Sequence, residues 1–398
     1  MAYRTILLCV DNSPHAGHAA DQAAVVARAF NSRVVAAHVY AARLHGRRFE
    51  DLEPGLPQKY QDPARLESSR RLHGPLIGKG LQIISDSYLA AIRAKLAGLS
   101  VEEKSLEGKN YVELVRESTD GYDLAVLGVR GLGLASTNGH GPAEALGSVC
   151  ERFLRRARTD VLVAKDSRPV GPSILVGIDG SPEAYAALRK ALQLAEAAGG
   201  RVTAVSCFDS EFHSVAFRSI AGVLSQKDAS LFRFKEQERL HNEVINEGLA
   251  NLYRGYLENA QIVARGRGQE IETRLLTGKP AYAIAALLRQ HSPTLLVVAR
   301  FGLHRTDDLD IGSTAETLVR LAPGNVLVVN ETAGGQPLVW TEEAEERLQR
   351  VPEFMRPMVR KAVESHTRAR GLTEITADVV TSAKTTHGVR VPGHRPDA

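Results

Sequence analysis

The sequence predicts an α/β protein with two tandem domains, each built on a doubly wound, five-stranded parallel sheet. The first observation behind this prediction is an internal duplication. Residues 5–89 match residues 173–257 at a constant offset of 168 positions, with 27 identities in 85 pairs. The second is that short apolar runs alternate with segments of helical period in each copy, as in parallel sheets connected by helices. The runs show little alternation, which indicates strands buried on both faces.

Local signals place the elements of the first copy. Strands are expected at 4–10, 33–40, 99–106, 124–127 and 161–164. A helix is expected to begin at Ser13-Pro14, because a hydroxyl cap and a proline in the first turn both favour a helix start. Further helices are expected at 111–118 and from Gly147-Ser148 onward. This order of strands and helices is typical of right-handed parallel connections.

A long insertion follows the second strand of each copy. Residues 41–99 are too many for a connecting loop, and apolar residues at helical spacing predict a helix over about residues 63–96. The insertion recurs in the second copy at 209–264. We therefore expect a helical insertion that was present before the duplication.

Composition limits the class of protein. Of the 398 residues, 43% are hydrophobic, and the net charge is +4, which does not favour a nucleic-acid partner. No apolar run approaches the roughly 20 residues needed to cross a bilayer. The separated cysteines Cys9, Cys150 and Cys207 are expected to be buried, reduced thiols and not a metal site. A cytoplasmic protein without a membrane or nucleic-acid partner is expected.

A candidate phosphate-binding segment follows the fourth strand of the second copy. Small residues let a backbone approach a ligand closely, and a helix start stabilises phosphate through its free N–H groups and its dipole. The first strand ends at an aspartate, which can accept a hydrogen bond from an adenine amine or a ribose hydroxyl. The candidate residues are Asp179, Ala299, Gly302, Gly312, Ser313 and Thr314.

The first copy carries a related set. Its candidate residues are Asp11, Gly128, Gly131, Gly147 and Ser148. In doubly wound sheets a ligand binds beyond the carboxyl ends of the strands, where the strand order reverses. We therefore expect Asp11 to face Gly128 and Gly147, and Asp179 to face Ala299 and Gly312. No metal cluster or catalytic set accompanies either site.

These residues resemble the ATP-binding type of the universal stress protein family. That family has an aspartate at the end of its first strand and the motif G-x2-G-x9-G-(S/T) after its fourth. The second copy departs from the motif only at Ala299, whereas the first copy has fifteen residues between Gly131 and Gly147 in place of nine. The longer loop leaves two alternatives open: closure over phosphate, or a degenerate site.

The resemblance implies further properties. ATP, or ADP or AMP, is the expected ligand, with Mg²⁺ as counter-ion. The backbone at Val39, or at Cys207 in the second copy, is expected to contact the base. Arg130 is placed to reach phosphate, and Phe301 replaces it in the second copy, so the two sites should differ in affinity. Pairing of the copies through their fifth strands would form an intrachain pseudo-dimer, and a homodimer stays open.

The expected domains are 1–168, 171–333 and 338–386, followed by a disordered end at 387–398. The third is a small helical domain with apolar positions at helical spacing in 355–366. It resembles the helical segment that ends the B subunit of light-independent protochlorophyllide reductase. Such a segment is too small for a large core, so we expect it to dock on another surface and to bind an unidentified protein partner.

Three functions follow from these observations. The first is a universal stress protein that binds an adenine nucleotide as a regulatory ligand and is not an enzyme, although slow ATP hydrolysis stays open. The alternative is a nucleotide-free scaffold that acts through the insertions and the C-terminal segment, near tetrapyrrole or redox enzymes. A third is a hydrolase or transferase on the same fold, which would need Asp179 for turnover.

Overall fold

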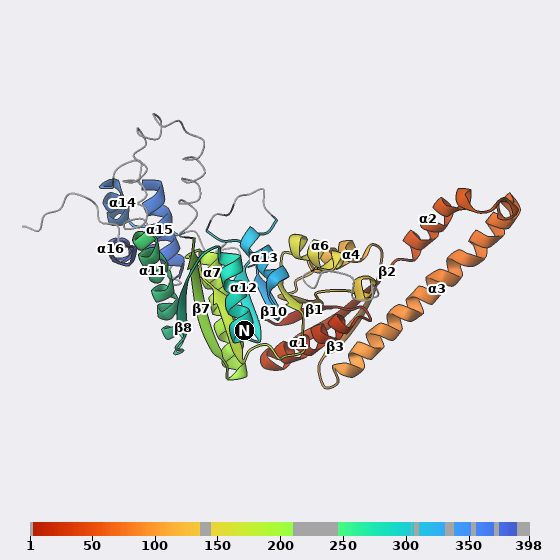
Figure 1. The fold of residues 1–398 in the computed structure, drawn as a ribbon, viewed down its shortest axis with the longest axis horizontal. Coiled ribbons are helices and arrows are strands. Elements are labelled where there is room, and N and C mark those ends of the chain that lie inside the picture. Colours follow the sequence, from red (N-terminus) through yellow and green to blue (C-terminus); the bar gives the residue numbers. More distant parts are fainter. Residues whose placement is uncertain are drawn as a thin grey trace, which may run out of the picture. The chain divides into compact units, whose positions relative to one another are not determined.

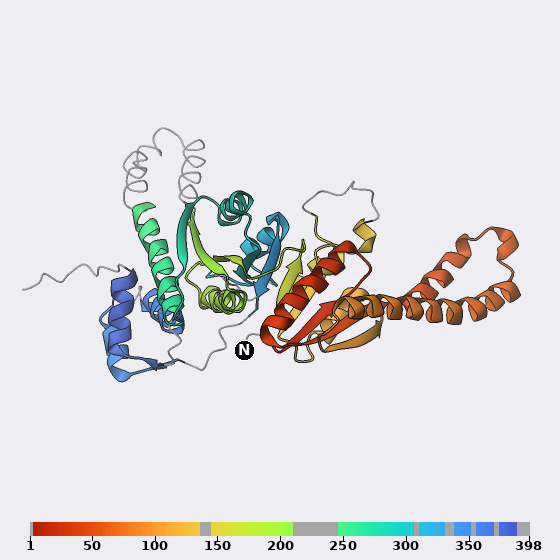
Figure 2. The same ribbon diagram turned by 90° about the horizontal axis from the view of Figure 1, so that it is seen from below.

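The computed structural model describes residues 3–135, 145–209, 246–303, 305, 310–330, 338–351, 356–369 and 374–387. The chain divides into two compact units (Figures 1 and 2). The first comprises Met1–Pro172 and Gly324–Val328, and the second comprises Ser173–Pro323 and Val329–Ala398. The C-terminal segment is grouped with the second unit in this division.

The first unit has the predicted parallel sheet, in the order β3-β2-β1-β4-β5. Its strands are β1 (Thr5–Cys9), β2 (Arg33–Tyr40), β3 (Val101–Glu107), β4 (Leu124–Gly128) and β5 (Asp160–Ala164). Its helices are α1 (Pro14–Phe30), α2 (Ala42–Leu52), α3 (Pro63–Lys95), α4 (Asn110–Glu117), α5 (Leu132–Ala135) and α6 (Ser148–Arg156). The strand order reverses between β1 and β4, which places the switch point beside Asp11.

The second unit repeats this order over the residues described. Its parallel strands run β9-β6-β7-β8, with β6 (Ser173–Gly177), β7 (Arg201–Phe208), β8 (Glu272–Thr277) and β9 (Leu295–Ala299). Its helices are α7 (Pro182–Ala198), α11 (Asn246–Arg265), α12 (Pro280–His291) and α13 (Ser313–Leu321). The fifth strand of the duplicated sequence is β10 (Asn325–Val329). Residues 324–328 group with the first unit, where β10 runs antiparallel to β5.

The first helix of each copy begins as the sequence predicts. The Ser13 hydroxyl accepts a hydrogen bond from the Ala16 N–H (3.1 Å), and Ser181 caps α7 in the same way. Proline occupies the first turn of both helices. Their small apolar residues face the sheet and are buried, so the core of each unit lies between this helix layer and the strands. The three cysteines are buried and free, as predicted.

The insertion of the first copy is a helical arm. The predicted helix forms as α3, which has 33 residues, and α2 packs beside its outer half (Figures 1 and 2). Arg70 of α3 binds the carboxylate of Glu53, which helps to hold the two sides of the arm together. Of the corresponding insertion of the second copy, residues 210–245 lie outside the described residues, and α11 follows them. Of the predicted disordered end, residues 388–398 lie outside the described residues, whereas His387 is the last residue of a helix.

Over its described residues the C-terminal segment forms three helices, α14 (Glu342–Gln349), α15 (Arg356–Ala369) and α16 (Ala377–His387). The structure adds a short parallel ladder between β11 (Val339–Trp340) and β12 (Glu374–Ile375), which the sequence pattern did not indicate. Five residues form its small core: Ala344, Val363, Ile375, Val379 and Ala383. Within the second unit α15 packs on α7 and α16 on α11, so one surface on which the segment docks is its own chain.

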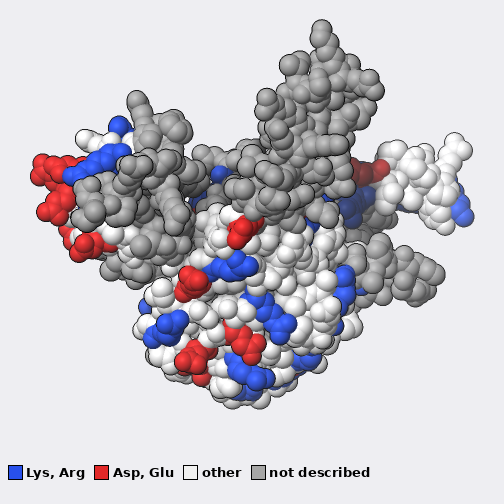
Figure 3. Space-filling model, turned by 60° about the vertical axis from the view of Figure 1, so that its left-hand side comes forward, with Lys and Arg blue, Asp and Glu red and all other residues white. Residues whose placement is uncertain are grey.

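Positively and negatively charged side chains are interspersed on one face of the molecule (Figure 3). On the face that Figure 3 shows, lysine and arginine side chains of the described residues alternate with aspartate and glutamate. Among the described helices, none has the length and apolar composition that crossing a membrane requires. Ten large hydrophobic side chains of the described residues are nevertheless exposed, and six of them lie in the helical arm.

Candidate nucleotide-binding sites

Asp11 links the two chain segments that leave the switch point of the first unit. One carboxylate oxygen accepts hydrogen bonds from the Ser13 N–H (3.0 Å) and the Ser13 hydroxyl (2.5 Å). The other accepts a hydrogen bond from the Leu132 N–H (3.2 Å), beyond β4. Asp11 does not cap α1 itself, because Ser13 does so. Its carboxylate instead fixes the capping serine and the turn after β4.

Asp179 makes the same contacts in the second unit. One oxygen accepts hydrogen bonds from the Ser181 N–H (3.0 Å) and hydroxyl (2.5 Å), and the other accepts from the Leu303 N–H (2.8 Å). The two aspartates therefore occupy equivalent positions with equivalent partners. The duplication preserved the geometry as well as the residue.

Each aspartate lies close to a glycine in the turn that follows the fourth strand of its copy. A Cβ at Gly131 would lie 2.6 Å from the Asp11 Oδ2, and a Cβ at Gly302 would collide with the same oxygen of Asp179. Each aspartate thus lies against the second glycine of its motif. The expectation that Asp11 faces Gly128 and Gly147 stays a prediction, and all three residues line one cavity.

Gly128 and Gly147 let two backbones approach each other in the first unit. A Cβ at Gly128 would lie 2.7 Å from the backbone carbon of His15, and one at Gly147 would lie 3.2 Å from the Val129 carbonyl oxygen. The Gly147 N–H donates to that same carbonyl (2.9 Å), which holds the start of α6 beside the end of β4. Among the described residues no side chain caps α6, whose first residue is Ser148. Its first N–H groups can therefore bind a ligand.

The second unit has the same arrangement at α13. Gly312 precedes the helix, and its N–H donates to the Arg300 carbonyl (2.9 Å). A Cβ at Gly312 would lie 3.1 Å from that oxygen. Ser313 and Thr314 form the first turn, and Ala299 ends β9.

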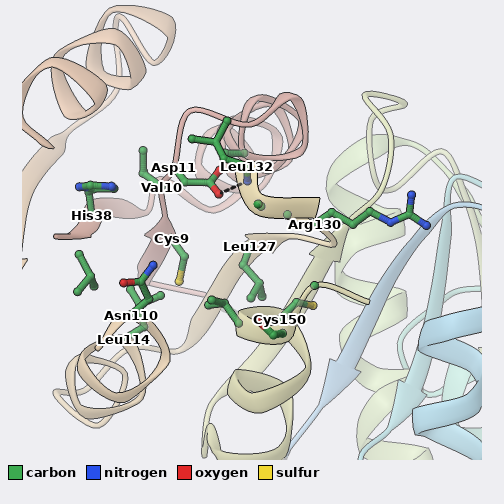
Figure 4. A pocket seen from close by; sticks show the side chains of 18 of the residues that line it. Cys9, Val10, Asp11, His38, Asn110, Leu114, Leu127, Arg130, Leu132 and Cys150 are labelled. Carbon is green, nitrogen blue, oxygen red and sulfur yellow. Dashed lines mark hydrogen bonds between the residues drawn. The ribbon is translucent and has the colours of Figure 1, made fainter. Parts of the chain in front are cut away.

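The two sites differ most in volume. The first cavity measures about 620 Å³, and its lining includes Asp11, Val39, Gly128, Gly131, Gly147 and Ser148 (Figure 4). The second cavity measures about 250 Å³, and its lining includes Asp179, Cys207, Ala299, Gly302, Gly312, Ser313 and Thr314. Small-molecule sites typically occupy about 300–1,000 Å³. The first cavity lies in this range, although the motif spacing fits the family better in the second copy.

Two aromatic side chains line the smaller second cavity. Tyr253 lines it from α11, at the position that Ser85 holds in the first copy, and Phe301 lines it where the first copy has Arg130. The guanidinium of Arg305 lies 4.5 Å from the centre of the Phe301 ring. Large rings at positions of smaller or outward-pointing side chains reduce the space left for a ligand.

Family models assign the fold independently. The model for the universal stress protein family matches residues 2–165 and again residues 172–330. The chain belongs to the universal stress protein family. A second model, described as Proto-chlorophyllide reductase 57 kD subunit, matches residues 340–384, as the C-terminal segment suggested.

Individual relatives agree with the family. A protein described as a universal stress protein of Staphylococcus haemolyticus is 31% identical over 190 residues, which are 48% of this chain and 95% of the relative. A Staphylococcus aureus counterpart is 29% identical over 181 residues, 44% of this chain and 96% of its own. A crystal structure of a universal stress protein from Archaeoglobus fulgidus covers 83% of this chain and all of its own, with a TM-score of 0.53 at 17% identity. This last likeness concerns the fold alone.

Arg130 of this universal stress protein does not point into the first cavity. Its Nε donates to the Ala145 carbonyl (2.9 Å), and Figure 4 shows its guanidinium directed away from the pocket. In the second copy Arg300, one position earlier in the motif, binds the Asp310 carbonyl in the same way (2.8 Å). Both arginines therefore brace the loop before the helix. The expected phosphate contact of Arg130 would need another rotamer.

A cationic cluster lies beside the first cavity. Lys109, Arg152 and Arg156 each place their charge 5.1–5.5 Å from the centre of the Tyr111 ring. They come from the start of α4 and from α6, two helices that also line the cavity. Their charge favours an anionic ligand there. Over the described residues, no group of three histidine, cysteine or acidic side chains is arranged to hold a metal ion.

Two side chains that the sequence did not single out line the first cavity. His38 lies on β2, and its Nδ1 is hydrogen-bonded to the Ser85 hydroxyl of α3 (2.8 Å). Tyr88, one turn further along α3, packs edge-on against the His38 ring at 5.2 Å between centroids. Tyr88 recurs as Tyr256 in the duplication, which was the only signal available from the sequence.

Burial of histidines predicts a loss of stability in mild acid. Burial lowers the pKa of His38, although the charge of Asp11 opposes this shift. Burial, His18 and Arg130 lower the pKa of His15. Because both folded-state pKa values lie below the unfolded value of about 6.5, the unfolded chain binds more protons in acid. We expect the contribution of these two histidines to the melting temperature to be constant above about pH 7.5 and to become destabilising below about pH 6.5.

The variant His38→Asn tests how much of the fall in melting temperature in acid comes from His38 and not from His15. Asparagine can keep a hydrogen bond to Ser85 but does not titrate. Calorimetry from pH 7.5 to 5.5 should show a smaller fall in the melting temperature than in wild type. An equal fall in both proteins would contradict this assignment.

Proposed function

We propose that this universal stress protein binds ATP, or another adenine nucleotide, as a regulatory ligand in the first cavity. The observation that supports this most is a cavity of about 620 Å³ at the switch point of a doubly wound sheet, with an aspartate on one side and an uncapped helix start on the other. The ligand is expected to shift conformation or assembly in a stress response.

The base and ribose would lie at the carboxyl ends of β1 and β2. The backbone at Val39 would contact the base, as the family resemblance implies, with the rings of His38 and Tyr88 beside it. Asp11 would accept a hydrogen bond from a ribose hydroxyl. Its carboxylate is already oriented by Ser13 and Leu132, so little ordering is needed on binding.

The phosphates would lie between the turn after β4 and the start of α6. A side chain at Gly128 would meet the His15 backbone and one at Gly147 would meet the Val129 carbonyl, so both glycines keep these segments close together. The N–H groups at Ser148 begin a helix whose dipole favours an anion. Mg²⁺ would accompany the phosphates as a counter-ion. The cationic cluster at Tyr111 adds a long-range attraction.

We propose that the second cavity is the weaker site. Its aspartate and glycines match those of the first, but Tyr253 and Phe301 occupy part of the volume. The nucleotide acts as a ligand in this proposal and not as a rapidly turned-over substrate. Both oxygens of Asp11 already accept hydrogen bonds, which disfavours a role as general base.

Matched aspartate variants test this proposal by isothermal titration with ATP and Mg²⁺. Loss of a hydrogen bond to a charged group lowers affinity by about 10- to 100-fold, so Asp11→Ala should weaken the tighter site by that factor. Asp179→Ala, which removes equivalent contacts in the second unit, should leave the tighter site unchanged. Absence of ATP binding by wild type would contradict the proposal and favour the scaffold function. Equal titrations of wild type and Asp11→Ala would exclude the first cavity.

A further inference from the structure

The helical arm exposes more large hydrophobic side chains than the rest of the described structure together. Six of the ten such residues lie between α2 and the middle of α3. They are Leu52, Tyr60, Leu72, Leu76, Ile83 and Ile84. Apolar surface gathered in this way on a soluble protein marks an interaction site.

Three of these residues form one stripe along α3. Leu72, Leu76 and Ile83 are separated by four and seven positions, so they lie within about 40° of one another around the helix. Their exposed fractions are 62%, 68% and 56%. We call these three residues the apolar stripe.

The opposite face of α3 is the one that packs on the rest of the unit. Ile77 and Leu81 are half-buried, and Ser85 and Leu89 are buried. These positions lie about 100–180° from the centre of the stripe. The stripe is therefore not a continuation of the core but a second, outward face of the same helix.

A positively charged residue lies at one end of the apolar stripe and a negatively charged residue lies at the other. Arg65 precedes it and Asp86 follows it, both exposed and both within about 40° of the same line along α3. Two parallel copies of this face would bring arginine to arginine and aspartate to aspartate. Two antiparallel copies bring Arg65 of each to Asp86 of the other. The face is thus complementary to itself in one orientation only.

We propose that α3 pairs antiparallel with α3 of a second copy of this chain, through the apolar stripe. A two-fold axis between residues 77 and 78 would place Leu72 opposite Ile83 and Leu76 opposite the aliphatic part of Lys79. Each contact occurs twice, as two-fold symmetry requires. Arg65 and Asp86 then lie one helical turn apart across the interface, close enough to pair.

The duplicated sequence disfavours the second insertion as the partner. At the position of Ile83 the second copy has Asn251, and at the position of Asp86 it has Arg254. The Arg254 guanidinium donates to the Asn251 side chain (2.7 Å), so both are engaged within α11. An arginine at this position would repel Arg65 instead of binding it. The combination of stripe and opposite charges is particular to the first copy.

The size of the stripe sets the expected strength of the pairing. Standard interfaces bury about 1,600 Å² in total, and three aliphatic side chains from each copy fall short of this. We therefore expect a reversible dimer whose population rises over micromolar concentrations. A tight, obligate dimer is not expected.

Sedimentation equilibrium of the full-length protein tests the pairing. Leu72→Glu should weaken dimerisation at least tenfold, because each dimer then has two carboxylates facing Ile83 and close to Asp86. Tyr282→Glu is the control, since Tyr282 on α12 is also 62% exposed and also becomes a glutamate. A monomeric wild type at all concentrations would overturn the proposal. So would a wild-type dimer that Leu72→Glu leaves intact, because another surface would then form it.

A charge exchange tests the antiparallel orientation. Arg65→Asp and Asp86→Arg should each weaken the dimer, and the double variant should restore it. Failure of the double variant to restore dimerisation would overturn the orientation. Lys79→Cys lies beside the proposed axis and should form a disulfide-linked dimer on mild oxidation, with the native cysteines buried. Arg65→Cys would lie roughly 40 Å from its counterpart and should not.

Discussion

Replacement of Gly147 by valine is expected to lower the affinity for ATP by about 100-fold or more. The Cβ of a side chain at this position would lie 3.2 Å from both the Val129 oxygen and the Arg130 Cα. The two methyl groups of valine add further volume at a contact that is already tight, so α6 must move away from the turn after β4. Separation of these segments removes the N–H groups proposed to bind phosphate, and a loss of about 2.7 kcal/mol corresponds to 100-fold.

The second copy provides the control for this prediction. A Cβ at Gly312 would lie 3.1 Å from the Arg300 oxygen, so Gly312→Val should strain its unit by a comparable amount. We expect overpacking to reduce stability by about 1–3 kcal/mol in both variants. Titration with ATP should show the large loss of affinity only in Gly147→Val. A large loss in Gly312→Val alone would instead place the tighter site in the second unit.

Elements that depend on local signals could be predicted from the sequence. The start of α1 at Pro14 needs only Ser13 and the proline, and the start of α3 at Pro63 needs only the residues around it. Because the sequence is duplicated, each element predicted in the first copy could also be predicted at the equivalent position of the second copy. The parallel order of the strands followed from the alternation of strands and helices.

The relative size of the two cavities could not be predicted in the same way. The motif spacing favoured the second copy, but the volume depends on Tyr253, which enters from a helix of the insertion. Its counterpart Ser85 binds His38 in the first copy, and neither contact can be read from a motif. The direction of the Arg130 side chain likewise depends on a carbonyl fifteen residues away.

Buried amides that hold the segment after β5 also gave no signal in the sequence. Asn325 of β10 is 1% exposed. Its Oδ1 accepts hydrogen bonds from the Lys165 N–H (2.8 Å) and the Asp166 N–H (3.2 Å), and its Nδ2 donates to the Arg168 carbonyl (3.1 Å). An asparagine at the start of a strand reads as an ordinary turn residue. Only the tertiary structure shows that the Asn325 side chain supplies the hydrogen-bond partners of backbone groups in residues 165–168.

Asn325→Leu is therefore expected to destabilise this segment by about 2–4 kcal/mol, because several buried polar groups lose their partners. Hydrogen exchange of the peptide that covers residues 160–170 measures this loss. Its protected amides should exchange about 30-fold faster or more, since 2 kcal/mol corresponds to that factor. Asn12→Leu makes the same change at an exposed position and should leave the exchange unchanged. Unchanged protection in Asn325→Leu would contradict the role assigned to this side chain.

The side-chain amide of Gln22, on α1, binds the same segment as that of Asn325. A double variant tests whether the two amides stabilise one structural element. Gln22 is fully buried, and its Nε2 donates to the carbonyls of Asp166 and Arg168 (3.0 Å each). Its Oε1 accepts a hydrogen bond from the Val170 N–H (3.1 Å). Both side-chain amides bind the same short segment, residues 165–170. Once one variant has freed this segment, loss of the second amide should therefore cause a smaller further loss of protection. The double variant Gln22→Leu/Asn325→Leu should thus accelerate exchange by less than the product of the single effects.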